Sequence, residues 1–165
     1  MKIRISSVVN DSIVDGAGLR LAVFTQGCLH NCPNCHNIHT HDLCGGKETD
    51  TEKILNLLAE NPILDGVTLT GGEPFLQAKE CAEIAKKTHE MGLNVWTFTG
   101  YTYEELLDAN NLDFMELLNN TDVLIDGRFE KDLRSLELKF KGSRNQRIID
   151  LKKTLEKGEI VELYN

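Results

Sequence analysis

The sequence is short of proline and of long apolar runs. Only three of its 165 residues are proline, and no repeat, low-complexity tract or linker rich in Pro, Gly or Ser divides it. No apolar run approaches the roughly 20 residues that cross a bilayer, and the segment from Met1 to Ile5 lacks the apolar core of a secretory signal. We therefore expect a single domain over residues 1–165, with no membrane partner and a cytoplasmic location.

Positive charge is also scarce. The chain has 18 Lys and Arg against 26 Asp and Glu, a net charge of −8. Nucleic-acid-binding domains normally carry a basic surface that neutralises phosphates, so we expect no DNA or RNA partner. One stretch reverses the sign, because Arg128 to Arg147 contains seven Lys or Arg and three Asp or Glu. Such a run is usually solvated surface, but it also suits an acidic partner or an anionic ligand.

The cysteines do not suit a disulfide framework. Their number is odd, at five, and three of them form a CxxxCxxC motif at Cys28, Cys32 and Cys35. This pattern indicates a reducing compartment and metal ligation. Cys81 lies among alanines and is predicted to be a small core residue, whereas Cys44, beside two glycines, allows either interpretation.

Three clustered thiolates favour an iron–sulfur cluster. A four-iron cluster normally takes four Cys thiolates, one per iron, so a loop with three leaves one iron open to another ligand. The alternative is a structural zinc site with a fourth ligand from a nearby residue. Structural zinc usually shows two CxxC-like pairs, and the sequence has no second pair. The candidates for a fourth zinc ligand are His36, His39, His41 and Cys44.

The apolar pattern alternates between strand and helix periodicity. Strands are predicted at 2–9, 21–25, 66–70, 94–99, 122–125 and 145–149, and helices at 79–91, at 151–157 and after capping boxes at Thr49–Glu52 and Thr102–Glu105. This alternation predicts an α/β fold with a mostly parallel sheet. A closed eight-stranded barrel takes about 250 residues, so this chain predicts a partial, open (β/α) barrel.

Ligands of such folds bind where parallel strands end. The cysteine loop and Gly71-Gly72-Glu73 both follow predicted strands. If a zwitterionic, sulfonium-bearing ligand lies on the cluster, the two glycines would bring backbone carbonyls close to its ammonium group, and Glu73 would add a negative charge for the same cation. The alternative is an ordinary glycine turn with a solvated Glu. His30 and most other histidines are expected to be exposed.

Several longer stretches resemble a known family. The CxxxCxxC spacing is the signature of the radical S-adenosylmethionine enzymes. Residues 14–20, Gln26-Gly27-Cys28 and Cys35-His36-Asn37 resemble the opening of the glycyl-radical-enzyme activases, and residues 70–74, 96–101, 122–129 and 142–147 resemble the activases of anaerobic ribonucleoside-triphosphate reductase. The last two stretches separate these activases from those of pyruvate formate-lyase.

The resemblance implies a site and a reaction. It implies one 4Fe-4S cluster on Cys28, Cys32 and Cys35, with S-adenosyl-L-methionine against Asn34, Cys35, His36, Gly71, Gly72 and Glu73. The reduced cluster would cleave this cosubstrate to methionine and a 5′-deoxyadenosyl radical, which takes a hydrogen from a glycine Cα. The cofactors perform the chemistry, so no protein acid, base or nucleophile is expected. Asn34 departs from the aromatic residue that many radical S-adenosylmethionine enzymes carry there.

The resemblance also implies partners. Anaerobic ribonucleoside-triphosphate reductase would be the protein substrate, and a flavodoxin or ferredoxin would donate the electron. Two other functions stay open at the level of sequence. One is a radical enzyme that acts on another glycyl radical enzyme or on a small molecule. The other is a noncatalytic zinc or iron–sulfur binding module.

Overall fold

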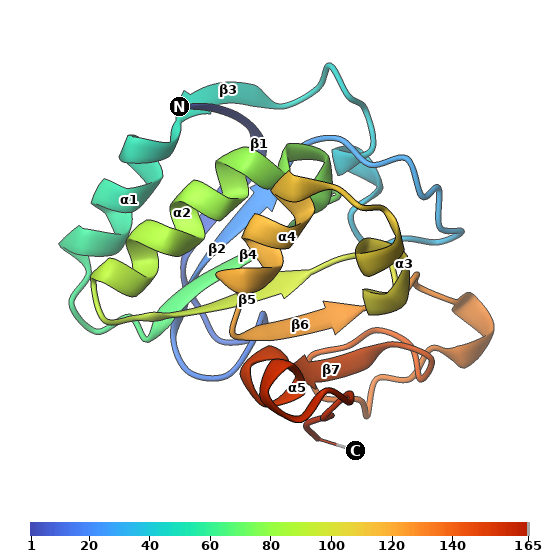
Figure 1. The fold of residues 1–165 in the computed structure, drawn as a ribbon. Helices are drawn as coiled ribbons and strands as arrows, with labels where there is room; N and C mark the ends of the chain where they lie inside the picture. Colours follow the sequence, from blue (N-terminus) through green and yellow to red (C-terminus); the bar gives the residue numbers. More distant parts are fainter. Residues whose placement is uncertain (165) are drawn as a thin grey trace.

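The computed structural model describes residues 1–164, which form one seven-stranded sheet with five α-helices (Figure 1). The strand order is β3-β1-β2-β4-β5-β6-β7. The strands are β1 (Lys2–Ser12), β2 (Arg20–Thr25), β3 (Lys47–Asp50), β4 (Gly66–Gly71), β5 (Asn94–Phe98), β6 (Val123–Asp126) and β7 (Arg147–Asp150). The helices are α1 (Thr51–Glu60), α2 (Ala78–Glu90), α3 (Tyr103–Asp108), α4 (Leu112–Asn119) and α5 (Leu151–Lys157).

The four central strands confirm the predicted parallel sheet. β2, β4, β5 and β6 pair in parallel, whereas β1 pairs antiparallel with both β2 and β3, and β7 pairs antiparallel with β6. Helices α1, α2 and α4 lie side by side over one face of the sheet (Figure 1). The result is the expected partial barrel, with the carboxyl ends of four parallel strands at one edge.

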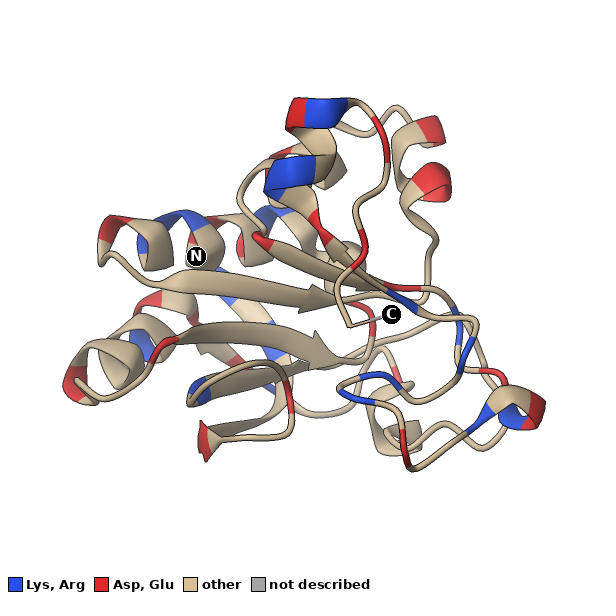
Figure 2. Ribbon diagram, turned by 90° about the horizontal axis from the view of Figure 1, so that it is seen from below, with Lys and Arg blue, Asp and Glu red and all other residues tan. Residues whose placement is uncertain are grey.

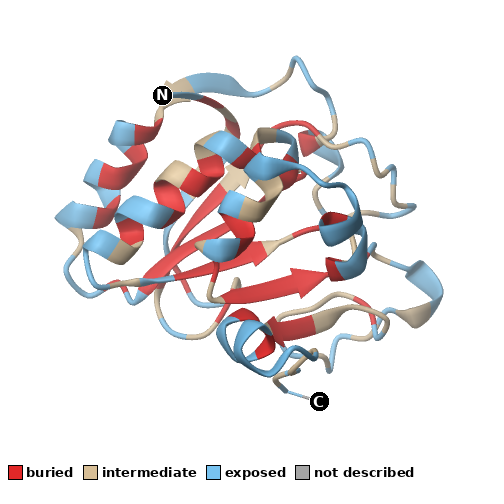
Figure 3. Cartoon of the chain, viewed as in Figure 1, coloured by how far each residue is buried: buried red, intermediate tan, exposed pale blue. Residues whose placement is uncertain are grey.

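Burial of both sheet faces explains the apolar strands. Five of the six residues of β2 and all four of β6 are buried, and parallel strands covered on both faces read as nearly continuous apolar runs. The helices turn one side toward these strands and the other toward solvent (Figure 3). In α1 that side consists of Ile54, Leu55 and Leu58, spaced three and four residues apart. No helix in residues 1–164 is both long and apolar enough to cross a membrane.

Several local predictions are confirmed. α2 is followed by Gly92 and α5 by Gly158, both with a left-handed φ, at +78° and +72°. The capping box of α3 is present, because Thr102 Oγ1 accepts from Glu105 N and Glu105 Oε1 accepts from Thr102 N.

Other local predictions are wrong. Thr49 does not cap a helix, because it pairs with Ile3 as part of β3, and α1 begins after Asp50. The strand predicted at 145–149 is present as β7, which pairs antiparallel with β6 and so lies outside the parallel part of the sheet. α4 has no counterpart among the predictions, although Asn111 is its N-cap and accepts hydrogen bonds from two backbone amides.

A buried arginine fixes the loop between β1 and β2. The Arg20 side chain donates to Thr68 Oγ1 (2.7 Å) and to the carbonyls of Ala17 and Val67 (2.9 Å each). Its guanidinium lies 5.5 Å from the centre of the Trp96 ring. Burial lowers the pKa of Arg20 to about 10, so the group remains charged at neutral pH. Residues 13–19 are thereby held against the sheet.

Asp122 joins β5, α2 and α5 at the opposite end of the strands from the cysteine loop. Its Oδ2 accepts from Val95 N and from His89 Nε2 (2.7 Å each), and its Oδ1 lies 2.9 Å from Lys152 Nζ. Burial raises the pKa of Asp122, but these donors outweigh burial and hold the pKa below its usual value of 3.8.

Candidate functional site

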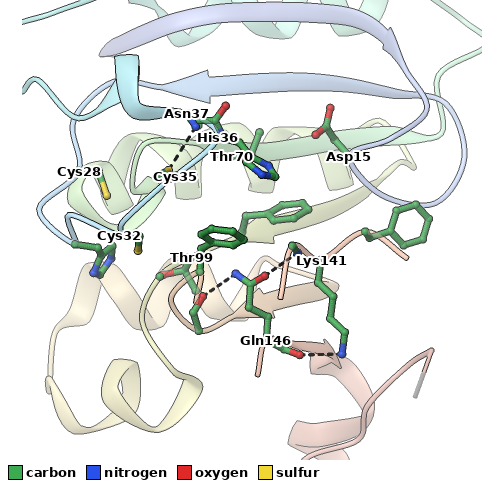
Figure 4. Close-up of a pocket in the computed structure, with 18 of the residues that line it drawn as sticks. Asp15, Cys28, Cys32, Cys35, His36, Asn37, Thr70, Thr99, Lys141 and Gln146 are labelled. Atoms are coloured by element: carbon green, nitrogen blue, oxygen red, sulfur yellow. Dashed lines mark hydrogen bonds between the residues drawn. The ribbon is translucent and has the colours of Figure 1, made fainter. Parts of the chain in front are cut away.

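A cavity of about 390 Å³ lies at the carboxyl ends of β2, β4 and β5 (Figure 4). Cys28, Cys32 and Cys35 line one side of it, and Gly71 and Gly72 also line it. Because the carboxyl ends of parallel strands meet at one edge, segments more than 30 residues apart reach the same space. The structure therefore brings the two predicted motifs together.

Two asparagines shape the cysteine loop. Asn31 and Asn34 each precede a cysteine and have left-handed φ angles of +53° and +58°. Asn tolerates this conformation far better than an aromatic or β-branched residue, because its short polar side chain can bond locally. Asn34 is exposed and does not line the cavity, in contrast to its predicted place beside the cosubstrate. The loop conformation thus explains why Asn replaces an aromatic there.

Backbone hydrogen bonds fix the base of the cysteine loop. Gly27 N donates to Thr40 O (2.6 Å), and Cys28 N donates to His41 O (3.2 Å). From the other motif, Glu73 N donates to Gly27 O at 2.8 Å. A Cβ on Gly72 would lie 3.0 Å from both N and C of Gly27 and closer still to its oxygen. A glycine at position 72 is therefore what lets the two motifs touch.

The thiols have the chemistry of metal ligands. Burial raises the pKa of Cys28 to about 11 and also raises the pKa of Cys32, so a bound metal must displace their protons. In residues 1–164, no three His, Cys, Asp or Glu side chains lie close enough together to hold one metal ion. A zinc ion needs its ligands about 2.0–2.3 Å away, whereas a four-iron cluster takes one thiolate per iron. Three thiols that line one cavity supply one thiolate to each of three irons, which fits such a cluster.

Glu73 lies beneath the cysteine loop and does not line the cavity. Its side chain is 1% exposed and accepts hydrogen bonds from four protein donors. One of them is His30, whose Nε2 lies 2.6 Å from Glu73 Oε2 and whose side chain is 7% exposed. The prediction that His30 is exposed is wrong, because this residue is drawn inward by the carboxylate.

The other side of the cavity consists of residues that the motifs did not predict. Val14 and Asp15 reach it from the loop that Arg20 fixes. Residues 127–146, which we call the strap, close it from the C-terminal side (Figure 4). Gln146 holds the strap together: its Oε1 accepts from the Gly142 and Ser143 amides and its Nε2 donates to Gly127 O. The signals in the sequence that pointed to this segment were its basic charge and the resemblance of residues 122–129 and 142–147 to a family.

The remaining candidate residues differ in how far they are buried and in whether they line the cavity. His36 and Asn37 line the cavity next to Cys35, and Asn37 N donates to Cys35 Sγ at 3.4 Å (Figure 4). Cys81 is fully buried in the core, as predicted, and burial raises the pKa of its thiol. Cys44 is exposed, and it does not line the cavity.

Comparisons with known proteins support an iron–sulfur cluster in this chain. Residues 14–149 match a family model described as a 4Fe-4S single cluster domain. The chain is 34% identical to the anaerobic ribonucleoside-triphosphate reductase-activating protein of Escherichia coli K12 over 143 residues, which cover 81% of this chain and 90% of that protein. It is 38% identical to the pyruvate formate-lyase-activating enzyme of Clostridium pasteurianum, over 72% of this chain and 54% of that enzyme.

A solved structure supports the fold. The crystal structure of QueE from Escherichia coli superposes with a TM-score of 0.51 at 17% identity, and the match covers 62% of this chain and 54% of that one. The sequence matches extend over most of the chain and include all three cysteines of the loop. The chain therefore belongs to the family of anaerobic ribonucleoside-triphosphate reductase-activating proteins.

Proposed function

We propose that this chain activates an anaerobic ribonucleoside-triphosphate reductase by generating a glycyl radical on it. One observation carries the proposal: three thiols and two strand-end glycines line a single cavity, in a chain that is similar over most of its length to activating proteins of that reductase. The function follows from the site as well as from the similarity, because a cluster with one open iron can bind and act on a small ligand.

Each motif has a separate task in this proposal. Cys28, Cys32 and Cys35 hold one 4Fe-4S cluster and leave one iron without a protein ligand. Gly71 and Gly72 offer their backbone to the amino acid part of S-adenosylmethionine, which can approach closely because no Cβ intervenes. When bound, the reduced cluster supplies the electron that cleaves S-adenosylmethionine to methionine and a 5′-deoxyadenosyl radical, which then takes a hydrogen atom from a glycine Cα of the reductase.

We assign the adenine end of the cosubstrate to the backbone after the third cysteine. Cys35 and His36 line the cavity, and the His36 ring lies 5.3 Å from that of Phe129 on the strap. Residues of the cysteine loop and of the strap then surround the reacting atoms. Their contribution is to orient the cosubstrate and to exclude water from a reactive species.

The cavity mouth suits a protein substrate. Leu136 of the strap is 95% exposed and Val14 is 71% exposed, and both line the cavity. The strap is basic in an acidic chain, and Figure 2 shows Lys and Arg along it. An apolar mouth with basic residues fits an extended segment of an acidic protein surface. A glycine at the tip of that segment enters most easily because it lacks a side chain.

Anaerobic reconstitution tests the proposal. The chain, reconstituted with iron and sulfide and given a reductant and S-adenosylmethionine, should produce a glycyl radical on the reductase, measured by electron paramagnetic resonance (EPR). Cys28→Ala should abolish the signal and most of the iron, whereas Cys44→Ala, at an exposed cysteine outside the cavity, should keep both. Formation of 5′-deoxyadenosine without any radical on the reductase would contradict the substrate assignment.

A second substrate is supported by the similarity to a pyruvate formate-lyase-activating enzyme at 38% identity. The same EPR assay with pyruvate formate-lyase in place of the reductase distinguishes the two, and we expect the reductase to be preferred. We further propose a flavodoxin or ferredoxin as electron donor, and a cytoplasmic location. Replacing the chemical reductant with each carrier in turn tests the donor.

A further inference from the structure

We propose that His30 and Glu73 form a latch that positions the cysteine loop, and that Glu73 affects the cosubstrate through this latch instead of binding its ammonium group. The inference rests on the proposed function, because it concerns the placement of the cluster relative to S-adenosylmethionine. It assigns positioning roles to two buried residues, neither of which is a metal ligand in the proposal.

The carboxylate of Glu73 has no capacity left for a ligand. Its Oε1 accepts from Phe75 N at 3.0 Å and from Thr99 Oγ1 at 2.9 Å. Its Oε2 accepts from Gly100 N at 2.8 Å and pairs with His30 Nε2 at 2.6 Å. A carboxylate has about four lone-pair sites, and these four donors occupy them. A bound ammonium group would have to displace one of them from a side chain that is 1% exposed.

The imidazole of His30 is held from the side of β5 as well. Its ring packs edge-on against Tyr101, with 4.6 Å between ring centres. A Cβ on Gly100 would overlap the His30 ring, so this glycine makes room for the imidazole. The ring therefore has one place, between the ends of β4 and β5.

The position of His30 in the sequence turns this contact into a positioning device. It lies between Cys28 and Cys32, so fixing its ring fixes the segment that joins two proposed ligands. Glu73 directly follows Gly71-Gly72, the proposed cosubstrate contact. The latch thus connects the ligands of the cluster to the backbone that holds its cosubstrate. Residues that orient metal ligands typically affect affinity or activity by roughly 10- to 100-fold.

EPR of the reduced cluster and the Kd of S-adenosylmethionine test the latch without any reductase, so an error in the proposed protein substrate does not affect the result. His30→Ala and Glu73→Ala should both retain the cluster, because all three cysteines remain. Each variant should change the EPR spectrum recorded without S-adenosylmethionine, and each should raise the Kd of S-adenosylmethionine by roughly tenfold. The double variant should be no worse than either single one, since both break the same contact.

Two further variants separate a latch from a general loss of stability. His30→Gln, which retains a donor at a similar reach, should restore most of the spectrum and affinity. His89→Ala breaks the other His–carboxylate pair of the fold, to Asp122 at 2.7 Å, and should change neither. One result would overturn the proposal. In it, Glu73→Ala weakens the binding of S-adenosylmethionine but keeps the wild-type EPR spectrum in its absence, and His30→Ala matches the wild type in both measurements. That pattern would make Glu73 a direct ligand of the cosubstrate.

Discussion

Replacing Gly72 with alanine tests how closely the two motifs must approach. The added Cβ would overlap Gly27 O and would lie 3.0 Å from N and C of Gly27, whereas ordinary contact begins at 3.4 Å, so the backbone must separate by more than 0.4 Å. The obstacle is backbone, which cannot rotate away as a side chain can. Because Gly27 precedes Cys28, the displacement passes directly to the first proposed cluster ligand.

The cost of this overlap has two parts. Overpacking of this kind typically destabilises a protein by about 1–3 kcal/mol. At about 2–4 °C per kcal/mol for a chain of this size, Tm should fall by roughly 2–12 °C. Misplacement of reacting groups by a fraction of an ångström to an ångström costs up to about 100-fold in rate. We therefore expect the Kd of S-adenosylmethionine to rise at least roughly tenfold and the rate of 5′-deoxyadenosine formation to fall with it.

Gly158→Ala is the matched control. Gly158 has a left-handed φ of +72° at the end of α5, and a Cβ there would meet no atom within 4 Å. Backbone strain alone should make this substitution cost about 1–2 kcal/mol, so Tm should fall by an amount similar to that expected for Gly72→Ala. Its iron content and cosubstrate affinity should match the wild type. If Gly72→Ala also binds the cosubstrate like the wild type, the argument from close backbone approach is wrong.

Three further outcomes follow from other parts of the structure. Asn34→Gly should keep the iron content, whereas Asn34→Val should lower it and cost about 1–2 kcal/mol, because valine disfavours the left-handed backbone there; equal iron in both variants would contradict this. Asp122→Asn should destabilise the protein by about 1–3 kcal/mol at pH 7. The pKa of Asp122 is lowered in the folded protein, so the carboxylate stabilises the fold fully above pH 3.8 and progressively less as it protonates below that pH. Chemical denaturation should therefore show the free energies of unfolding of the wild type and the variant converging in acid. Charge reversal at two exposed strap residues outside the cavity, Lys131→Glu with Arg144→Glu, should raise KM for the reductase and leave cosubstrate cleavage without reductase unchanged. Reversal of the exposed Lys53 on α1 should change neither.

Much of the fold could be predicted because its signals are local. The strand that became β2 contains the continuous apolar run from Leu21 to Phe24, and glycines mark the ends of α2 and α5. The sheet edge that holds the site followed from the parallel order of the strands. The wrong assignment of Thr49 has a physical reason. The T-x-x-E pattern is compatible with a helix cap, but backbone pairing with β1 places Thr49 in β3 instead.

The internal arrangement of the site could not be predicted in the same way. A sequence places Glu73 beside two glycines, but only the structure shows that its carboxylate turns away from the cavity toward His30, 43 residues earlier. The strap has no regular periodicity, and its path depends on hydrogen bonds from Gln146. Long-range polar contacts leave no repeating pattern in a sequence, so they become visible only once the chain is folded.

The open sheet affects what kind of partner this molecule can serve. Antiparallel β1 and β7 flank the four parallel strands, and the sheet ends at β3 and β7 without closing into a barrel. A large partner can remain outside and insert only a narrow segment. In the proposed reaction that partner would form the missing wall of the chamber, so the seal against solvent would belong to the assembled pair and not to either protein alone.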